Sequence, residues 1–272
     1  MKLTAPTAKP IQLDAIRPNL GVELAYKKKL QALIDEMNRS IVYWVRAAWR
    51  KSPPVASMAQ DRKRGPLSDL SDTMVRLGRH WQRRFDALAP ELAEVFMYGA
   101  TKHTDAAMMS SLKRAGFAVQ FKPTRASMEG FEAILAENVG LIKTISSQHF
   151  QTIEGDVWRA VAGGYDVKEL TDTLQRRYGV TRTRAAFIAS DQTNKAKATI
   201  EQVRRLELGI TQAVWVHSGA GREPRESHVT AGRDKLLFDL AKGAYIDGKW
   251  ILPGTEINCR CISRAVVPGF ED

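Results

Sequence analysis

Apolar residues recur at three- and four-residue spacing through most of the first 209 residues, and this periodicity constrains the fold more than any other feature. One stripe runs from Leu30 to Ala48 and another from Met74 to Leu88. Such spacing places apolar side chains on one face of a helix, and that face must be buried against other helices. We therefore predict an almost entirely helical body up to residue 209.

Proline and glycine set the expected helix ends in the first half. Residues 1–20 contain three prolines and show no periodicity, which indicates an extended arm or a flexible leader. The first helix is predicted to run from about residue 22 to Pro53. Pro90 is expected to begin a new helix as its first residue, since the N–H that proline lacks has no intrahelical partner there. Gly116 is expected to stop the next helix.

An extended segment at residues 117–123 separates the two halves of the chain. Ser127 is predicted to cap the helix that follows it. Asp166 precedes Glu169 by the spacing of a capping box and is predicted to begin another helix. Gly209 is expected to end the last helix, because glycine adopts the left-handed conformation of a C-terminal cap.

The pattern changes at residue 210. Residues 213–216 are rich in β-forming side chains, and residues 244–251 have the pattern of two strands joined by a tight Asp247-Gly248 turn. We predict the α+β class: a mainly α-helical body with a small C-terminal β-containing module.

Two domains follow from these boundaries. The predicted N-terminal helical region with its leader spans residues 1–125, and the second domain spans residues 126–272. Within the second domain we expect a helical half at 126–209 and a β module at 210–272.

The net charge is concentrated in the helical body. Residues 211–272 hold eight basic and eight acidic side chains, so residues 1–210 carry the whole net charge of +11. Basic clusters of this part are at residues 27–29, 62–64, 83–84, 176–177 and 204–205. They are interpreted either as solvated helix faces or as contacts to nucleic-acid phosphates or an acidic partner. The tryptophans on apolar stripes are expected in the core: Trp44, Trp49, Trp81 and Trp158.

Composition also excludes several classes of protein. No apolar run approaches the ~20 residues that cross a bilayer, and the N-terminus has no secretory signal pattern. The chain has only two cysteines, Cys259 and Cys261, with one residue between them. This spacing argues against a disulfide framework and predicts a protein of the reducing cytoplasm.

The C-terminal part contains candidate metal ligands. His228, Cys259 and Cys261 are suitable zinc ligands, with His217 as a fourth. One residue separates the two cysteines, whereas two to four residues separate the paired cysteines of common zinc motifs. This spacing argues against a zinc site. The favoured interpretation is that the two cysteines share one face of a strand and pack as small apolar residues, with no metal and no other cofactor; zinc is the alternative.

The serines, histidines and acids of the C-terminal part allow two enzymatic interpretations. A serine hydrolase would use Ser218 or Ser227 with one of the two histidines, yet Ser and His that neighbour in sequence do not define a catalytic triad. A metal-dependent nuclease needs clustered carboxylates, and the acids of the C-terminal part are dispersed. We therefore predict no catalytic residue.

The C-terminal part carries a family resemblance. Its segments follow the patterns W-x-H-S, P-R-x-S-H, Y-I-D-G-x-W-I and P-G-x-x-I-N-C-R-C. These resemble the C-terminal signature of the phage Mu F-like minor head proteins, the phage head morphogenesis family. The similarity covers about residues 126–265. The residues that carry the motif are Trp215, Arg225, His228, Gly232, Pro253, Gly254, Asn258, Cys259, Arg260 and Cys261.

The resemblance implies a structural role. Such proteins are minor components of tailed-phage heads, associated with the portal vertex and needed for head assembly. It implies portal protein and capsid or scaffold proteins as partners, with packaged DNA as a further contact, and it implies the virion and the host cytoplasm as locations. Basic sequence-independent nucleic-acid binding is the second interpretation, and a metal-dependent nucleic-acid enzyme is the third.

Some family members carry a Cys-x-x-Cys before the final Cys-x-Cys, and the matching positions here are Arg225 and His228. This departure removes one zinc ligand. We expect instead that Arg225 and His228 form hydrogen bonds to the loop from Pro253-Gly254 to Asn258-Cys259-Arg260-Cys261 and hold it in place.

Overall fold

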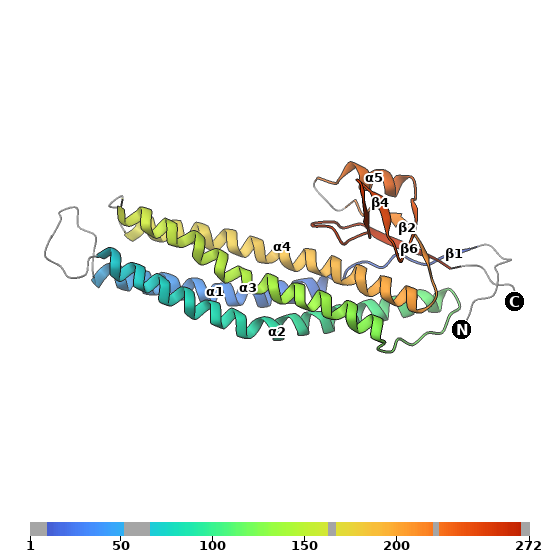
Figure 1. The fold of residues 1–272 in the computed structure, drawn as a ribbon, viewed down its shortest axis with the longest axis horizontal. Helices are drawn as coiled ribbons and strands as arrows, with labels where there is room; N and C mark the ends of the chain where they lie inside the picture. The colour runs from blue at the N-terminus through green and yellow to red at the C-terminus, as the bar shows by residue number, and fades with distance from the viewer. Residues whose placement is uncertain (1–9, 52–65, 163–166, 220–222, 268–272) are drawn as a thin grey trace. The chain divides into compact units, whose positions relative to one another are not determined.

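The computed structural model describes residues 10–51, 66–162, 167–219 and 223–267 (Figure 1). The helices are α1 (Leu20–Lys51), α2 (Pro66–Arg114), α3 (Arg125–Ala162), α4 (Val167–Glu207) and α5 (Glu226–Arg233). The strands are β1 (Ile11–Gln12), β2 (Gln212–Val216), β3 (Leu237–Asp239), β4 (Ala244–Ile246), β5 (Lys249–Ile251) and β6 (Ile262–Val267). The predicted α+β class, a helical body followed by a small β-containing part, is confirmed.

The chain divides into two compact units, which we name by their content. The bundle unit comprises residues 25–93 and 137–188, and the sheet unit comprises residues 1–24, 94–136 and 189–272. Each of the four long helices contributes one segment to each unit. This division differs from the two domains expected from the sequence, whose boundary at residues 125 and 126 stays a prediction.

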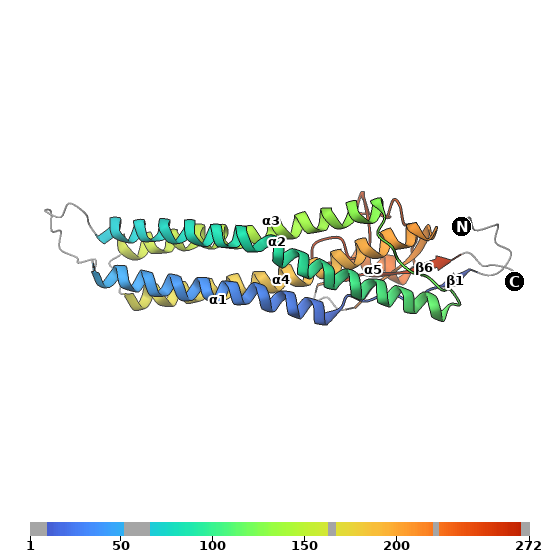
Figure 2. The ribbon, with the colours of Figure 1, turned by 90° about the horizontal axis from the view of Figure 1, so that it is seen from below.

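Four helical segments lie side by side in the bundle unit (Figures 1 and 2). Arg182 of α4 donates to Asp35 of α1 at 2.7 Å, and the Gln82 amide of α2 donates to the carbonyl of Lys143 in α3 at 3.3 Å. The apolar stripes predicted from the periodicity face one another between the helices. The largest side chains with less than 2% exposure in this unit are Leu30, Ile34, Met37, Ile41, Phe85, Ile142, Ile145, Ile153, Leu170 and Leu174.

The tryptophans of the helical body do not all lie in this core. Trp49 and Trp81 are buried, as predicted. Trp44 and Trp158 are 51% and 39% exposed, so their assignment to the core is wrong. The buried positions of α1 continue through Val45 to Trp49, and Trp44 lies one residue before this stripe, which rotates it out of the core.

Of two helix ends expected in the first half, one is wrong and one is confirmed. Pro90 lies inside α2, which runs without a break to Arg114, so it does not begin a new helix. Its side chain is exposed, while Ala89 and Ala93 beside it are buried in the core. Burial on both sides of the proline outweighs the loss of one backbone hydrogen bond. Gly116 follows the end of α2 with a φ of +89°, as expected of a glycine stop.

The caps of the later helices were partly predicted. Thr124, not Ser127, caps α3: its hydroxyl accepts from the N–H of Ser127 at 3.1 Å, and the Ser127 hydroxyl accepts from the N–H of Thr124 at 2.9 Å. Asp166 lies outside the described residues. Gly209 ends α4 with a φ of +76°, and the N–H of Ile210 donates to the carbonyl of Arg205 at 2.9 Å, which confirms the predicted C-cap.

The sheet unit contains an antiparallel sheet of order β1-β6-β2-β3 and a separate hairpin of β4 and β5. The hairpin turn is the predicted Asp247-Gly248 pair, with φ of 52° and 78°. Its two rings, Tyr245 and Trp250, are exposed and 5.2 Å apart. Buried residues of this unit's core include Leu13, Leu112, Ile210, Ala213, Trp215, Ala231, Phe238, Leu240, Ala244, Ile246, Ile251, Ala265 and Val267.

The segment at residues 10–19 is an extended arm that belongs to the sheet unit. Ile11 pairs with Val267, and the side chains of Leu13 and Ile16 are buried. The first 20 residues were expected to form either an extended arm or a flexible leader, and residues 10–19 form the extended arm. Residues 1–9 lie outside the described part.

One of the basic clusters is not on a surface at all. Arg204 and Arg205 are 4% and 2% exposed and pair with carboxylates, so they are neither a solvated face nor a phosphate contact. Arg84 and Arg177 each form an ion pair within the bundle unit. Residues 62–64 lie outside the described residues. None of the helices in the described ranges has the length and apolar content that a bilayer crossing requires.

Candidate functional site

The loop between β5 and β6 is held against α4 by residues of the family motif. The N–H of Asn258 donates to the carboxylate of Asp191 at 2.6 Å. Asn258 has a φ of 58°, a left-handed conformation that asparagine tolerates well. Gly254 has a φ of +94°, and a Cβ there would lie 3.4 Å from the Cβ of Ala198 in α4. The loop is thereby fixed in one conformation before β6 begins.

A second motif glycine places α5 over the end of β2. A Cβ on Gly232 would lie 2.5 Å from the Cβ of His217 and 2.7 Å from its backbone nitrogen. Only glycine fits such a close approach of two backbone segments. His228 lies one turn before Gly232 on α5, so the close approach brings its ring to the loop.

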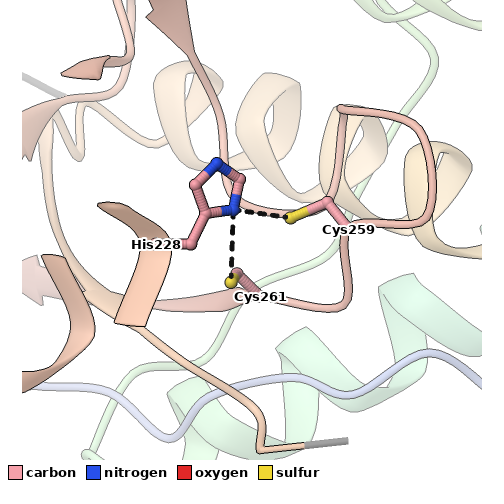
Figure 3. A group of neighbouring side chains, drawn as sticks. All are labelled: His228, Cys259 and Cys261. Carbon is pink, nitrogen blue, oxygen red and sulfur yellow. Dashed lines mark hydrogen bonds between the residues drawn. The ribbon is translucent and has the colours of Figure 1, made fainter. Parts of the chain in front are cut away.

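His228, Cys259 and Cys261 come together at this point (Figure 3). Nδ1 of His228 lies 3.5 Å from Sγ of Cys259 and 3.8 Å from Sγ of Cys261. The three side chains are 2%, 3% and 4% exposed, and their ligand atoms all lie within 4.8 Å of one another. Both cysteines are reduced and precede the strand β6, so they do not lie on a strand as expected.

The other side of the His228 ring faces a carboxylate. Nε2 lies 3.2 Å from Oε2 of Glu256, at an angle that does not make a hydrogen bond. Glu256 also pairs with Lys249 and lies 3.7 Å from Arg225. The Lys249 ammonium, aided by the charge of Arg225, lowers the pKa of Glu256 although partial burial opposes this. Glu256 is therefore a carboxylate at neutral pH.

The two thiols affect each other's ionisation. A hydrogen bond from the Cys261 thiol lowers the pKa of Cys259, helped by backbone N–H donors and opposed by burial. The same hydrogen bond and burial raise the pKa of Cys261. Of the two thiols, Cys259 is therefore the first to lose its proton.

The remaining motif residues surround this cluster. Trp215 is fully buried, and its ring stacks edge-on against His228 with 5.1 Å between centroids. Pro253 is buried and Arg260 is exposed. Arg225 donates from Nη2 to the carbonyl of Ile257 at 3.1 Å, a hydrogen bond to the loop of the expected kind. Nδ1 of His228 lies within hydrogen-bond distance of the Cys259 and Cys261 thiols, so His228 also contacts the loop as expected, through side chains.

A hollow of about 200 Å³ lies beside the cluster. Its lining includes the three clustered side chains together with His217, Ser218 and Glu223. His217 lies in the same hollow but not in the group whose ligand atoms converge. Ser227 donates to Asp247 at 2.7 Å and not to a histidine. In the described ranges, the acids of the C-terminal part form no cluster that a metal ion can share.

Two residues of the site were not singled out from the sequence. Asp191, on α4, anchors the loop, and Lys249, on β5, pairs with Glu256. A carboxylate that accepts a backbone N–H 67 residues away leaves no local signal in the sequence. Lys249 directly follows the Asp-Gly turn, and its place beside Glu256 depends on how the hairpin folds back.

Comparison with known proteins supports the family resemblance. A family model described as "Phage Mu protein F like protein" matches residues 151–264. An uncharacterised protein of Haemophilus influenzae is 34% identical over 143 residues, which are 53% of this chain and 31% of the relative. The chain therefore spans about a third of that relative's length. No solved structure matches the chain. Residues 151–264 are therefore similar to the phage Mu F-like proteins, the family that the C-terminal motifs resemble.

Proposed function

We propose that this protein is a minor structural component of the head of a tailed bacteriophage or prophage, bound near the portal vertex inside the capsid and needed for head assembly. The observation that carries the proposal is the family match over residues 151–264. The proposed partners are the portal protein and capsid or scaffold proteins. The proposed locations are the host cytoplasm during assembly and the virion afterwards.

The site geometry supports a structural role for the motif. Gly232 permits a close backbone contact, Asn258 ties the loop to α4, and Arg225 holds the carbonyl of Ile257. Each of these residues fixes a segment of the sheet unit and none needs a substrate. We therefore propose that the motif preserves the shape of this unit and that the protein is not an enzyme.

The decisive experiment is mass spectrometry of gradient-purified proheads and mature virions from a host that carries this gene. We expect the protein to co-sediment with the portal subunit at a few copies per particle. Presence in proheads but not in virions would restrict the role to assembly. Absence from both particles would refute the proposal.

The net charge of +11 favours one rival function, sequence-independent binding of nucleic acid through phosphates. The burial of Arg204 and Arg205 reduces the positive surface that this function needs. Titration of a mixed-sequence DNA duplex at several salt concentrations separates the two functions. Affinity that falls steeply with salt would favour the rival, and no affinity at low salt would exclude it.

A further inference from the structure

We propose that His228, Cys259 and Cys261 bind one zinc ion, through Nδ1 of the histidine and Sγ of each cysteine, with the fourth coordination position facing the hollow beside them. The sequence alone favoured an interpretation without metal, and the geometry of the three side chains changes it. The proposal does not rest on the role in the phage head.

The two distances from the histidine nitrogen to the sulfur atoms match those of a tetrahedral zinc site. Zinc–sulfur bonds of about 2.3 Å and zinc–nitrogen bonds of about 2.0–2.1 Å place such atoms about 3.5–3.8 Å apart. Nδ1 of His228 lies 3.5 Å and 3.8 Å from the two sulfur atoms. Figure 3 shows both sulfur atoms directed at the same ring nitrogen. One ion can therefore be reached by all three side chains with little movement.

The surroundings of His228 fit a metal-bound imidazole. Nε2 is buried and makes no hydrogen bond, although Oε2 of Glu256 lies 3.2 Å from it. When Nδ1 is bound to a metal, the ring proton is on Nε2, and a carboxylate is the usual acceptor for that proton. A small rotation of the ring completes this bond. Lys249 and Arg225 keep Glu256 in place.

The donor set selects the metal. Two thiolates and an imidazole favour zinc over magnesium or calcium, which prefer oxygen ligands. On binding, each thiol that is protonated releases its proton to solvent, and the sulfur lone pair forms the bond to zinc. The chain supplies three ligands, and a water molecule from the hollow completes the tetrahedron. A hollow of about 200 Å³ has room for it.

The ion would join two segments that are far apart in sequence, α5 and the loop before β6. Each is already positioned by a motif residue, Gly232 in α5 and Asn258 in the loop. Because the ligands are arranged before the metal arrives, little conformational entropy opposes binding. We expect the zinc-loaded chain to unfold at a higher temperature than the metal-free chain.

The test uses the purified full chain, kept reduced and never exposed to a chelator. Elemental analysis should find about one zinc ion per chain. After chelation, titration with Co²⁺ should give the visible spectrum of tetrahedral cobalt with sulfur ligands. The variants Cys259→Ser, Cys261→Ser and His228→Gln should each lower cobalt affinity at least about tenfold. The control His217→Gln changes the same hollow and should keep both stoichiometry and spectrum.

Several results would overturn the proposal. One is a folded, reduced wild-type chain that takes up neither zinc nor cobalt, which would make the cluster a packing contact only. Another is a cobalt spectrum that persists in the double variant Cys259→Ser/Cys261→Ser. Loss of binding in His217→Gln would refute the three-ligand assignment. The cobalt titration of the wild-type chain can refute the proposal by itself, so the test does not depend on every ligand variant being folded.

Discussion

The two units of the chain are stabilised by different kinds of contact. The bundle unit buries long apolar stripes from four helices, and any one position in a stripe resembles its neighbours. The sheet unit depends on single positions such as Gly232, Asn258 and the buried ion pairs of α4. A repeating contact leaves a periodic pattern in the sequence, whereas a single contact does not. This difference explains which features were predictable and suggests where substitutions will act most strongly.

The largest effect is expected from Arg205→Ala in the sheet unit. Arg205 is 2% exposed, pairs with Glu201 and donates to Ser263 at 2.7 Å. Its removal leaves buried polar groups without their partner, which should lower the free energy of unfolding by about 3–5 kcal/mol. Urea unfolding followed by circular dichroism measures the change.

The matched variant in the bundle unit is Arg84→Ala. Arg84 pairs with Glu36, and both side chains are more than 40% exposed. Its removal should cost less than about 1 kcal/mol, because solvent screens an exposed pair. Equal losses for Arg84→Ala and Arg205→Ala would contradict the contrast between the units.

The second largest loss of stability, after that of Arg205→Ala, is expected from Gly232→Ala. The new Cβ would lie 2.7 Å from the backbone nitrogen of His217, which cannot move without displacing β2. We expect a loss of about 2–3 kcal/mol from overpacking. Hydrogen exchange should locate the loss in the sheet unit, at residues 212–216. Unchanged protection of β2 in a destabilised variant would show that the close approach is not the cause.

The next effect concerns pH and lies in the bundle unit. Burial lowers the pKa of His149 to about 4, and Nδ1 lies 2.8 Å from the hydroxyl of Thr181. Between its unfolded pKa of about 6.5 and this value, the unfolded chain binds a proton that the folded chain does not. Stability is therefore lost as the pH falls, by up to about 2 kcal/mol between pH 7.5 and pH 5.

The variant His149→Asn tests this assignment, because an amide can keep a bond to Thr181 without titrating. Urea unfolding at both pH values should show a smaller pH dependence in the variant than in wild type. The carboxylates contribute equally to the pH dependence of stability in both proteins, so their contribution cancels in the comparison. An identical pH dependence would mean that His149 is not the group responsible.

The smallest expected effect is an increase in stability. Gly140 lies within α3 in the bundle unit, and a Cβ there would meet nothing within 4 Å. Gly140→Ala should raise stability by about 0.5–1 kcal/mol, because alanine has the higher helix propensity. The melting temperature measures it. The opposite sign for two Gly→Ala changes, at Gly140 and Gly232, would sharpen the contrast between repeating and single contacts.

Much of the fold was predictable from local patterns. The helical stripes, the Gly209 cap and the Asp247-Gly248 turn each depend on a few neighbouring residues. Pro90 was misjudged because its local preference for a helix start is outweighed by burial on both sides of it. The burial of Arg204 could not be foreseen, since its partner Asp105 lies 99 residues away.

The candidate site was predicted in its parts but not in its arrangement. His228, Cys259 and Cys261 were singled out by residue type, yet their convergence depends on how α5 approaches β2. That approach requires the close contact between Gly232 and the backbone of His217. The anchoring carboxylates, Asp191 and Glu256, come from α4 and from the loop itself, and only the folded chain brings them to these ligands.

The pairing of β1 with β6 has a consequence for biosynthesis. Ile11 is synthesised 256 residues before its partner Val267. At about 5–20 residues per second, some tens of seconds separate the two. During that time the helices of the bundle unit can already form, while β1 has no strand to pair with. The sheet unit is therefore completed only after the residues of the bundle unit have been synthesised, and a ribosome that stalls before β6 leaves it open.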